Sequence, residues 1–223
     1  MLAVINMRIF ALLLIFPLFG NSQTMQSIVR QLPIECLPDL NIKQRDVLLK
    51  KSFLELPDGD SLERVQYELD TPVLKNYISF GLSFPTGQAG FTNFELKRFK
   101  TISGSSLIIF SKYGGARSLY SQDTLKIFML NNGKLMENKG QNLLPQSISF
   151  NDFLKKQTPD SIRKKIESYS NSCYYLNREK SKEIEFNLST PFMSEELEKW
   201  LLGDTFIFTW NGKSFKRKLV FGN

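Results

Sequence analysis

The sequence predicts an α+β fold in which antiparallel β-sheet packs against a few helices. Several consecutive short runs alternate apolar and polar residues and are separated by turn residues, whereas helical periodicity is confined to a few short segments. Nineteen phenylalanines, most of them in the alternating runs, indicate a core built on sheets. Consecutive strands joined by short turns favour antiparallel pairing.

Two helices are expected before the first strand. Met25–Leu32 shows a short helical pattern, and Asn41 with Gln44 three residues later is typical of a helix N-cap with a capping box. This second helix is predicted to end near Phe53, before a turn at Leu56–Asp60. Its basic side chains are expected in solvent: Lys43, Arg45, Lys50 and Lys51.

The first sheet is predicted to begin at Val65, where the pattern changes to alternation. Further expected strands are Tyr77–Phe84, Phe91–Lys100, Leu107–Phe110 and Thr124–Leu130. Asn131–Lys134 then has the residues of a hairpin turn.

The second half predicts two short helices among further strands. Thr158 suits an N-cap with Pro159 at the first helical position, and Ser194 caps a helix that Gly203 ends. The expected strands are Cys173–Leu176 and Ile184–Leu188.

The chain closes with a predicted hairpin of Thr205–Trp210 and Ser214–Phe221. Asn211-Gly212 predicts a type I′ turn with positive φ at both positions. Alternation then places Phe206, Phe208 and Trp210 on one face, which is expected in the core together with Phe215, Leu219 and Phe221 of the return strand.

A weak internal sequence repeat suggests a duplication whose second copy is shortened. Asp123-Thr124 leads through an apolar strand to Asn132-Gly133-Lys134, and Asp204-Thr205 leads likewise to Asn211-Gly212-Lys213. The expected organisation is one helix-plus-sheet unit over residues 23–145 and a second, shorter one over 146–223. The alternative is that these are common turn sequences.

Met1–Ser22 has the layout of a secretory signal peptide. Arg8 precedes an apolar core, Ile9–Phe19, and Gly20 and Ser22 supply small residues before a cut at Gln23. The core is shorter than the roughly 20 apolar residues that span a membrane. We therefore expect export to the periplasm or the exterior, with no transmembrane segment in the mature chain; the alternative is an uncut membrane anchor.

Two cysteines, Cys36 and Cys173, leave two alternatives in an exported chain. An oxidising compartment permits a disulfide between them. Otherwise, both are small buried hydrophobic residues.

The chain lacks the residues of common catalytic sites. It has no histidine, which removes the usual base of serine and cysteine hydrolases, and it has no glycine-rich nucleotide loop. Ser161–Lys164 has the Ser-x-x-Lys spacing without its partner motif, and Asp58, Asp60 and Glu63 lack the spacing of a calcium loop. No catalytic, cofactor-binding or metal-binding residues are therefore expected.

The formal charge of +7 suits an anionic surface or polymer and is also compatible with no charged partner. The candidate surface for an anionic partner is the basic group Lys213, Lys216, Arg217 and Lys218. These observations predict a noncatalytic, exported binding protein of the cell envelope, whose partner is an envelope protein or an anionic glycan rather than nucleic acid. The alternative is a glycan-processing enzyme that uses two carboxylates, because such a pair needs only to be close in space.

Several stretches resemble a family of small secreted proteins of unknown function from Bacteroidetes-type Gram-negative bacteria. They are Leu37–Leu40, Arg45–Leu48, Leu74–Phe80, Phe94–Lys97, Leu107–Ile109 and Asp123–Phe128, within residues 25–137. The resemblance implies an exported α+β protein of repeated helix-plus-sheet units. It supplies no catalytic residues.

Overall fold

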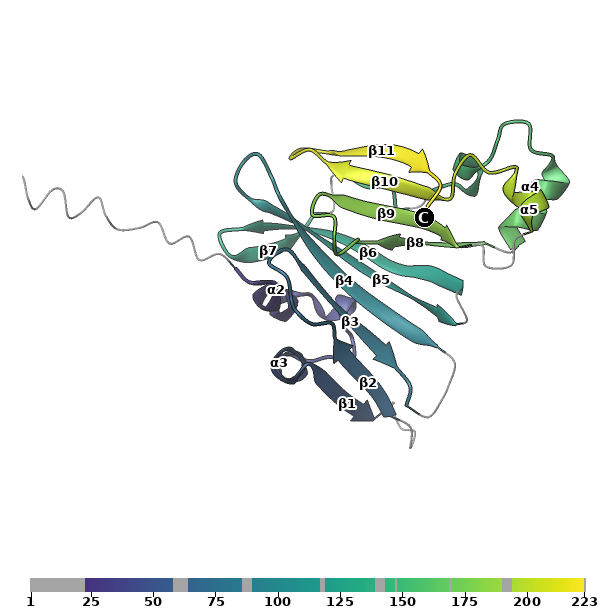
Figure 1. The fold of residues 1–223 in the computed structure, drawn as a ribbon. Helices are drawn as coiled ribbons and strands as arrows, with labels where there is room; N and C mark the ends of the chain where they lie inside the picture. Colours follow the sequence, from purple (N-terminus) through teal and green to yellow (C-terminus); the bar gives the residue numbers. More distant parts are fainter. Residues whose placement is uncertain are drawn as a thin grey trace, which may run out of the picture.

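The computed structural model contains two antiparallel β-sheets and a few short helices, which confirms the α+β prediction (Figure 1). It describes residues 23–57, 64–85, 90–116, 119–138, 143–146, 148–168, 170–189 and 194–222. The expected signal peptide, Met1–Ser22, and the acidic residues Asp58, Asp60 and Glu63 lie outside the described residues.

The first sheet has seven strands, each paired with the next in sequence. They are β1 (Phe53–Pro57), β2 (Arg64–Leu69), β3 (Tyr77–Ser83), β4 (Phe91–Lys100), β5 (Ser106–Ala116), β6 (Leu119–Asn131) and β7 (Lys134–Glu137). The β6–β7 turn has positive φ at Asn132 and Gly133, as its sequence predicts.

The second sheet has four strands in the order β11-β10-β9-β8. They are β8 (Asn171–Tyr175), β9 (Glu183–Ser189), β10 (Thr205–Trp210) and β11 (Phe215–Val220). Both the division into units at residues 145 and 146 and the duplication stay predictions.

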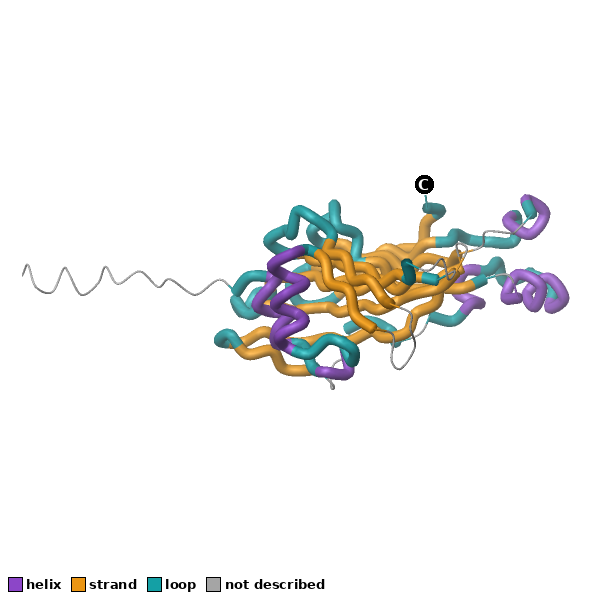
Figure 2. Tube along the Cα trace, turned by 90° about the horizontal axis from the view of Figure 1, so that it is seen from below, coloured by secondary structure: helices purple, strands orange, loops and turns teal. Residues whose placement is uncertain are grey.

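One face of the first sheet is covered by α2 (Met25–Gln31), η1 (Ile34–Cys36) and α3 (Ile42–Lys51) (Figures 1 and 2). The predicted capping box of α3 is present: Gln44 N–H donates to Asn41 Oδ1, and Asn41 N–H donates to Gln44 Oε1. Among the four basic residues expected in solvent, Arg45 is buried, which corrects the prediction. Its guanidinium donates to the carbonyls of Leu40 and Leu32, so the loop after α2 accounts for its burial.

The opposite face of the first sheet packs against the second sheet (Figure 1). Leu107, Ile109 and Ile127 of the first sheet share one cluster with Phe186 and Phe208 of the second. The short helices η2 (Phe150–Phe153), α4 (Asp160–Ser168) and α5 (Glu195–Glu198) add Phe153, Ile166 and Leu197 to this cluster. Figures 1 and 2 show α4 and α5 at the end of the molecule away from α2 and α3.

The chain passes from α3 directly into β1, whereas the sequence predicts that the helix extends to about Phe53 and that a turn follows at Leu56–Asp60. Ser52 adopts the left-handed conformation, φ 61, which ends the helix and redirects the chain. β5 and β6 are also longer than predicted, because their polar halves lie opposite each other and continue the ladder.

The C-terminal hairpin forms as expected, but its turn differs. Trp210 pairs with Phe215, so the connection has four residues, Asn211–Ser214, and Gly212 has a positive φ whereas Asn211 does not. Asn211 Oδ1 instead accepts hydrogen bonds from the backbone of Lys213 and Ser214, which replaces the expected two-residue type I′ turn. Phe221, expected in the core, lies just beyond β11 and is 59% exposed.

No helix among the described residues is long and apolar enough to cross a membrane.

Candidate functional site

The edge strand β8 lies directly on the face of the first sheet. Ser111 Oγ on β5 donates to the Tyr174 carbonyl at 2.8 Å, and Gln122 Oε1 on β6 accepts from Tyr174 N–H at 2.7 Å. On β4, Glu95 Oε2 accepts from Leu176 N–H at 2.7 Å. Side chains of the first sheet thus replace the missing neighbouring strand of β8.

Contact with β8 divides this face of the first sheet into two parts. On β5, Ser111 lies under β8, Ile109 lies in the core on one side, and Tyr113 lies on the other. On β4, Glu95 likewise contacts the chain at β8, and Phe99 lies in the core. The part away from the core forms one wall of a pocket of about 450 Å³, which we call the corner pocket.

The first wall of the corner pocket is largely aromatic. Phe91 and Asn93 from β4, Tyr113 from β5 and Tyr120 from β6 line it. The Phe91 and Tyr120 rings pack edge to face with centroids 5.4 Å apart. Such rings offer apolar contact and polarizable faces to a ligand.

The second wall comes from the face of the second sheet that points away from the core. Cys173 is directly opposite Asn187, and Tyr175 is opposite Glu185, so all four side chains share this face. Asn187 Oδ1 is buried and has no hydrogen-bond partner among the described residues. A buried acceptor without a donor is costly, and a ligand N–H or O–H would relieve that cost.

Glu95 anchors the two sheets behind the pocket. The residue is 3% exposed, and its Oε1 accepts from the Tyr77 hydroxyl at 2.9 Å and from the Tyr113 hydroxyl at 3.4 Å. Burial raises the pKa of the Glu95 carboxyl from 4.5 to about 7, although its hydrogen bonds oppose this shift. Burial and the Glu95 charge together raise the pKa values of both tyrosines as well.

Lys97, two residues along β4, is completely buried. Its Nζ donates to the carbonyls of Leu176, Asn177, Lys180 and Glu183 at 2.6–2.8 Å. Burial lowers the pKa of this ammonium to about 8, while the carboxylate of Glu95 opposes the shift, so the group stays protonated at neutral pH. Lys97 therefore holds the β8–β9 connection on the first sheet.

Replacing Glu95 by Gln should remove one pH dependence of stability. The folded state binds the Glu95 proton more tightly than the unfolded state, so its contribution to stability falls as pH rises from 4.5 to about 7. That change in pKa corresponds to roughly 3 kcal/mol. Urea unfolding of both proteins measures this effect. The free energy of unfolding of the Gln variant, relative to that of wild type, should be higher at pH 8 than at pH 4.5 by about this amount. A difference that does not change with pH would contradict the assignment.

Cys36 and Cys173 are free and buried in the structure, and the disulfide of the exported protein stays a prediction. Cys36 packs in the cluster beneath the helices, whereas Cys173 lines the corner pocket on the opposite face of the first sheet. The sheet between them prevents a disulfide in this arrangement. Burial raises the pKa of the Cys36 thiol to about 11 and that of Cys173 to about 12, which makes both poor nucleophiles.

The basic residues predicted to bind an anionic partner lie on and beside β11. All four are exposed: Lys213, Lys216, Arg217 and Lys218. Arg217 lies on the inner side, with its guanidinium carbon 4.7 Å from the centroid of the Phe206 ring and an ion pair to Asp152. Because β11 is an edge strand of the four-stranded sheet, this surface is separate from the corner pocket.

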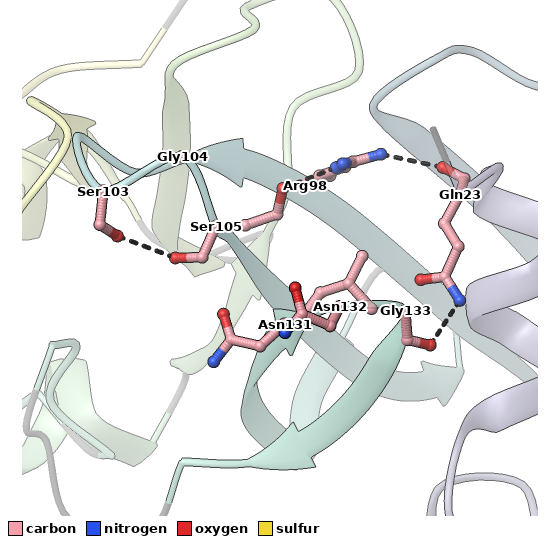
Figure 3. Close-up of a pocket in the computed structure, with 10 residues that line it drawn as sticks. Gln23, Arg98, Ser103, Gly104, Ser105, Asn131, Asn132 and Gly133 are labelled. Carbon is pink, nitrogen blue, oxygen red and sulfur yellow. Dashed lines mark hydrogen bonds between the residues drawn. The ribbon is translucent and has the colours of Figure 1, made fainter. Parts of the chain in front are cut away.

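A larger hollow of about 1140 Å³ lies near the N-terminal end of the described chain (Figure 3). Its polar groups mostly bind one another: Arg98 donates to the Gln23 carbonyl and to Ser106 Oγ, and Gln23 Nε2 donates to the Gly133 carbonyl. The buried Gln23 Oε1 has no partner among the described residues. Because its charged side chain is already engaged and none of the described residues that line it is aromatic, this hollow is a weaker candidate than the corner pocket.

Sequence reasoning missed the corner pocket. Its walls come from β4–β6 and from β8–β9, which are far apart in the chain. One signal was available: alternation in Phe91–Lys100 places Glu95 and Lys97 on the same side as Phe99, so two charges fall on a buried face.

The fold and the site define a protein with two antiparallel sheets, one resting on the other along an edge strand, and a pocket in the corner between them. A domain of an uncharacterized protein from Porphyromonas gingivalis W83 has a similar structure, with a TM-score of 0.60 and 14% identity. The match covers 87% of this chain and 97% of that chain, so the shared fold includes strands of both sheets. No family model and no curated protein matches the chain.

That structural relative comes from a Bacteroidetes bacterium, as does the family that the sequence resembles. At this level of identity the likeness shows the fold alone. Membership in a secreted family stays a prediction.

Proposed function

We propose that the protein is a noncatalytic, exported binding protein of the cell envelope whose ligand occupies the corner pocket. Asn187 lines this pocket and its buried Oδ1 has no hydrogen-bond partner among the described residues, which is the observation that carries the proposal. A volume of about 450 Å³ lies in the range of small-molecule sites, and an aromatic lining with a few polar groups is typical of them.

The geometry favours binding over carboxylate catalysis. Glu95 has the raised pKa of a general acid, but both its oxygens are engaged by the Tyr77 hydroxyl and the Leu176 amide. It is 3% exposed and is not among the residues that line the pocket. Glu185, the carboxylate in the lining, accepts a hydrogen bond from Asn177 Nδ2 at 2.6 Å. Glu95 thus has a structural role, and Glu185 is the single carboxylate among the described residues that line the pocket, whereas glycan hydrolysis uses a facing pair.

A pocket-filling variant tests the proposal. Small polar and aromatic compounds are screened by NMR against wild type, Ser189→Trp in the lining, and Lys50→Trp at an exposed position of α3. Compounds that shift wild-type resonances of Tyr175 and Asn187 should bind the Lys50 control equally and should lose binding to the Ser189 variant. Binding that survives in the Ser189 variant, or that never shifts pocket residues, would place the site elsewhere.

Export is the second part of the proposal and rests on the signal-like Met1–Ser22. Expressed from the full gene in a Gram-negative host, the protein should appear in the periplasm or medium with Gln23 as its first residue. Intact-mass measurement checks this result, and a mature protein that retains Met1 or Met7 would contradict it.

We further propose that the exposed basic group on β11 faces an anionic envelope protein or glycan. The exposure of Lys213, Lys216 and Lys218 on an edge strand supports this role. Binding through such charges weakens as salt rises.

A further inference from the structure

The charged side chain in the lining of the corner pocket is acidic, whereas the chain as a whole is basic. The formal net charge is +7, yet none of the described residues that line the pocket is a lysine or an arginine. Its hydrogen-bonding groups include the Glu185 carboxylate and the amide oxygen of Asn187. The described part of the lining therefore offers a carboxylate and further acceptor groups to a ligand, and no cationic side chain.

Several carboxylates act on groups in the wall of the pocket. Burial raises the pKa of the Tyr175 hydroxyl, and the charges of Glu95, Glu185, Asp70 and Glu179 raise it further. Glu95 likewise raises the pKa of the Cys173 thiol. Carboxylates therefore act on the wall from several directions, and each favours a cation in the pocket.

Lys97 and Lys180 are both engaged by groups of the β8–β9 region. Lys97 Nζ is enclosed by the four carbonyls of the β8–β9 connection. Lys180 Nζ lies 3.7 Å from Glu185 Oε1, but its side chain is 52% exposed and it also pairs with Glu183. An exposed pair of this kind is weak and screened by salt.

Aromatic side chains supply the remaining contact. Phe91, Tyr113 and Tyr120 on the first wall and Tyr175 on the second lie around the acceptors. Aromatic rings combined with a carboxylate recognise ammonium groups through cation–π attraction and hydrogen bonding.

We propose that the corner pocket binds a small primary amine: a protonated ammonium group, donating to Asn187 Oδ1 and the Glu185 carboxylate, on an apolar body among the aromatic side chains. This inference rests on the proposed binding function and names its ligand class. A primary ammonium fits better than a quaternary one, because only the former carries the N–H that the unpartnered Asn187 oxygen lacks.

Calorimetry with two matched probes tests the inference. Phenethylamine and 2-phenylethanol share an apolar body and differ in the charged group. At pH 7 wild type should bind the amine about tenfold more tightly than the alcohol. Glu185→Gln keeps an oxygen for the Asn177 amide and should reduce that preference about fivefold. Asn187→Leu should also weaken amine binding, whereas Glu55→Gln, on the distant strand β1, should change nothing.

The outcomes separate this inference from the proposed function. Equal binding of amine and alcohol, both lost in the Ser189→Trp variant, would overturn the ammonium ligand and leave the pocket as a binding site. Amine binding unchanged by Glu185→Gln and Asn187→Leu would overturn the inference as well. Absence of amine binding would refute it, while the compound screen described above decides on the proposed function.

Discussion

Replacing Lys97 by Met should lower the free energy of unfolding by about 3–5 kcal/mol, the range for removing one partner of a buried charged group. Met approximates the length of the stem but donates no hydrogen bond. The ammonium now donates to four backbone carbonyls, which would then lose their buried donor: those of Leu176, Asn177, Lys180 and Glu183. Chemical denaturation followed by circular dichroism measures the loss.

Lys100→Met is the matched control, because Lys100 lies on the same strand and its side chain is exposed. It should change stability by less than about 0.5 kcal/mol. Hydrogen exchange adds a local measurement: the Leu176 amide should lose protection in the Lys97 variant before the amides of β3 do. A Lys97 variant as stable as the control would show that the ammonium does not fasten β8 to the first sheet.

Trp210→Ala should cost about 3–5 kcal/mol, as large-to-small changes in a core do. Trp210 is 6% exposed, its ring packs on Phe215 and Phe99, and its Nε1 donates to the Lys100 carbonyl at 2.7 Å. The side chain therefore joins the C-terminal hairpin to the β4–β5 turn. The melting temperature should fall by roughly 6–20 °C in a scanning calorimeter.

Two variants separate the causes of this loss. Trp210→Phe keeps much of the ring packing but removes the hydrogen bond, so it should lie between wild type and Trp210→Ala. Phe221→Ala should have little effect, because Phe221 is 59% exposed. If Trp210→Ala melts like wild type, the hairpin does not depend on this contact and its core assignment is wrong.

Local sequence signals predicted most of the elements. The Asn41–Gln44 capping box, the Asn132-Gly133 turn and the burial of Phe206, Phe208 and Trp210 all depend on neighbours in sequence, and the structure confirms them. The same local reasoning failed where a residue's partner is distant. Arg45 was expected in solvent because its helix neighbours are charged, but carbonyls of the loop after α2 enclose it.

The corner pocket could not be predicted for a related reason. Its position depends on where β8 crosses the first sheet, and that crossing is fixed by contacts of Glu95, Ser111 and Gln122 with backbone more than 50 residues away. Periodicity identifies the strands and their faces but not which strand edge rests on which face. The available signal was the alternation of β4, which places the charged residues Glu95 and Lys97 on the same buried face as Phe99.

A crystal structure of the protein soaked with phenethylamine tests the central claim most directly. We predict density for the amine in the corner pocket, with its nitrogen within hydrogen-bonding distance of Asn187 Oδ1 and the Glu185 carboxylate and its ring beside Tyr120 or Tyr175. Density for the amine at another place, or a corner pocket filled by the protein's own side chains, would contradict the account.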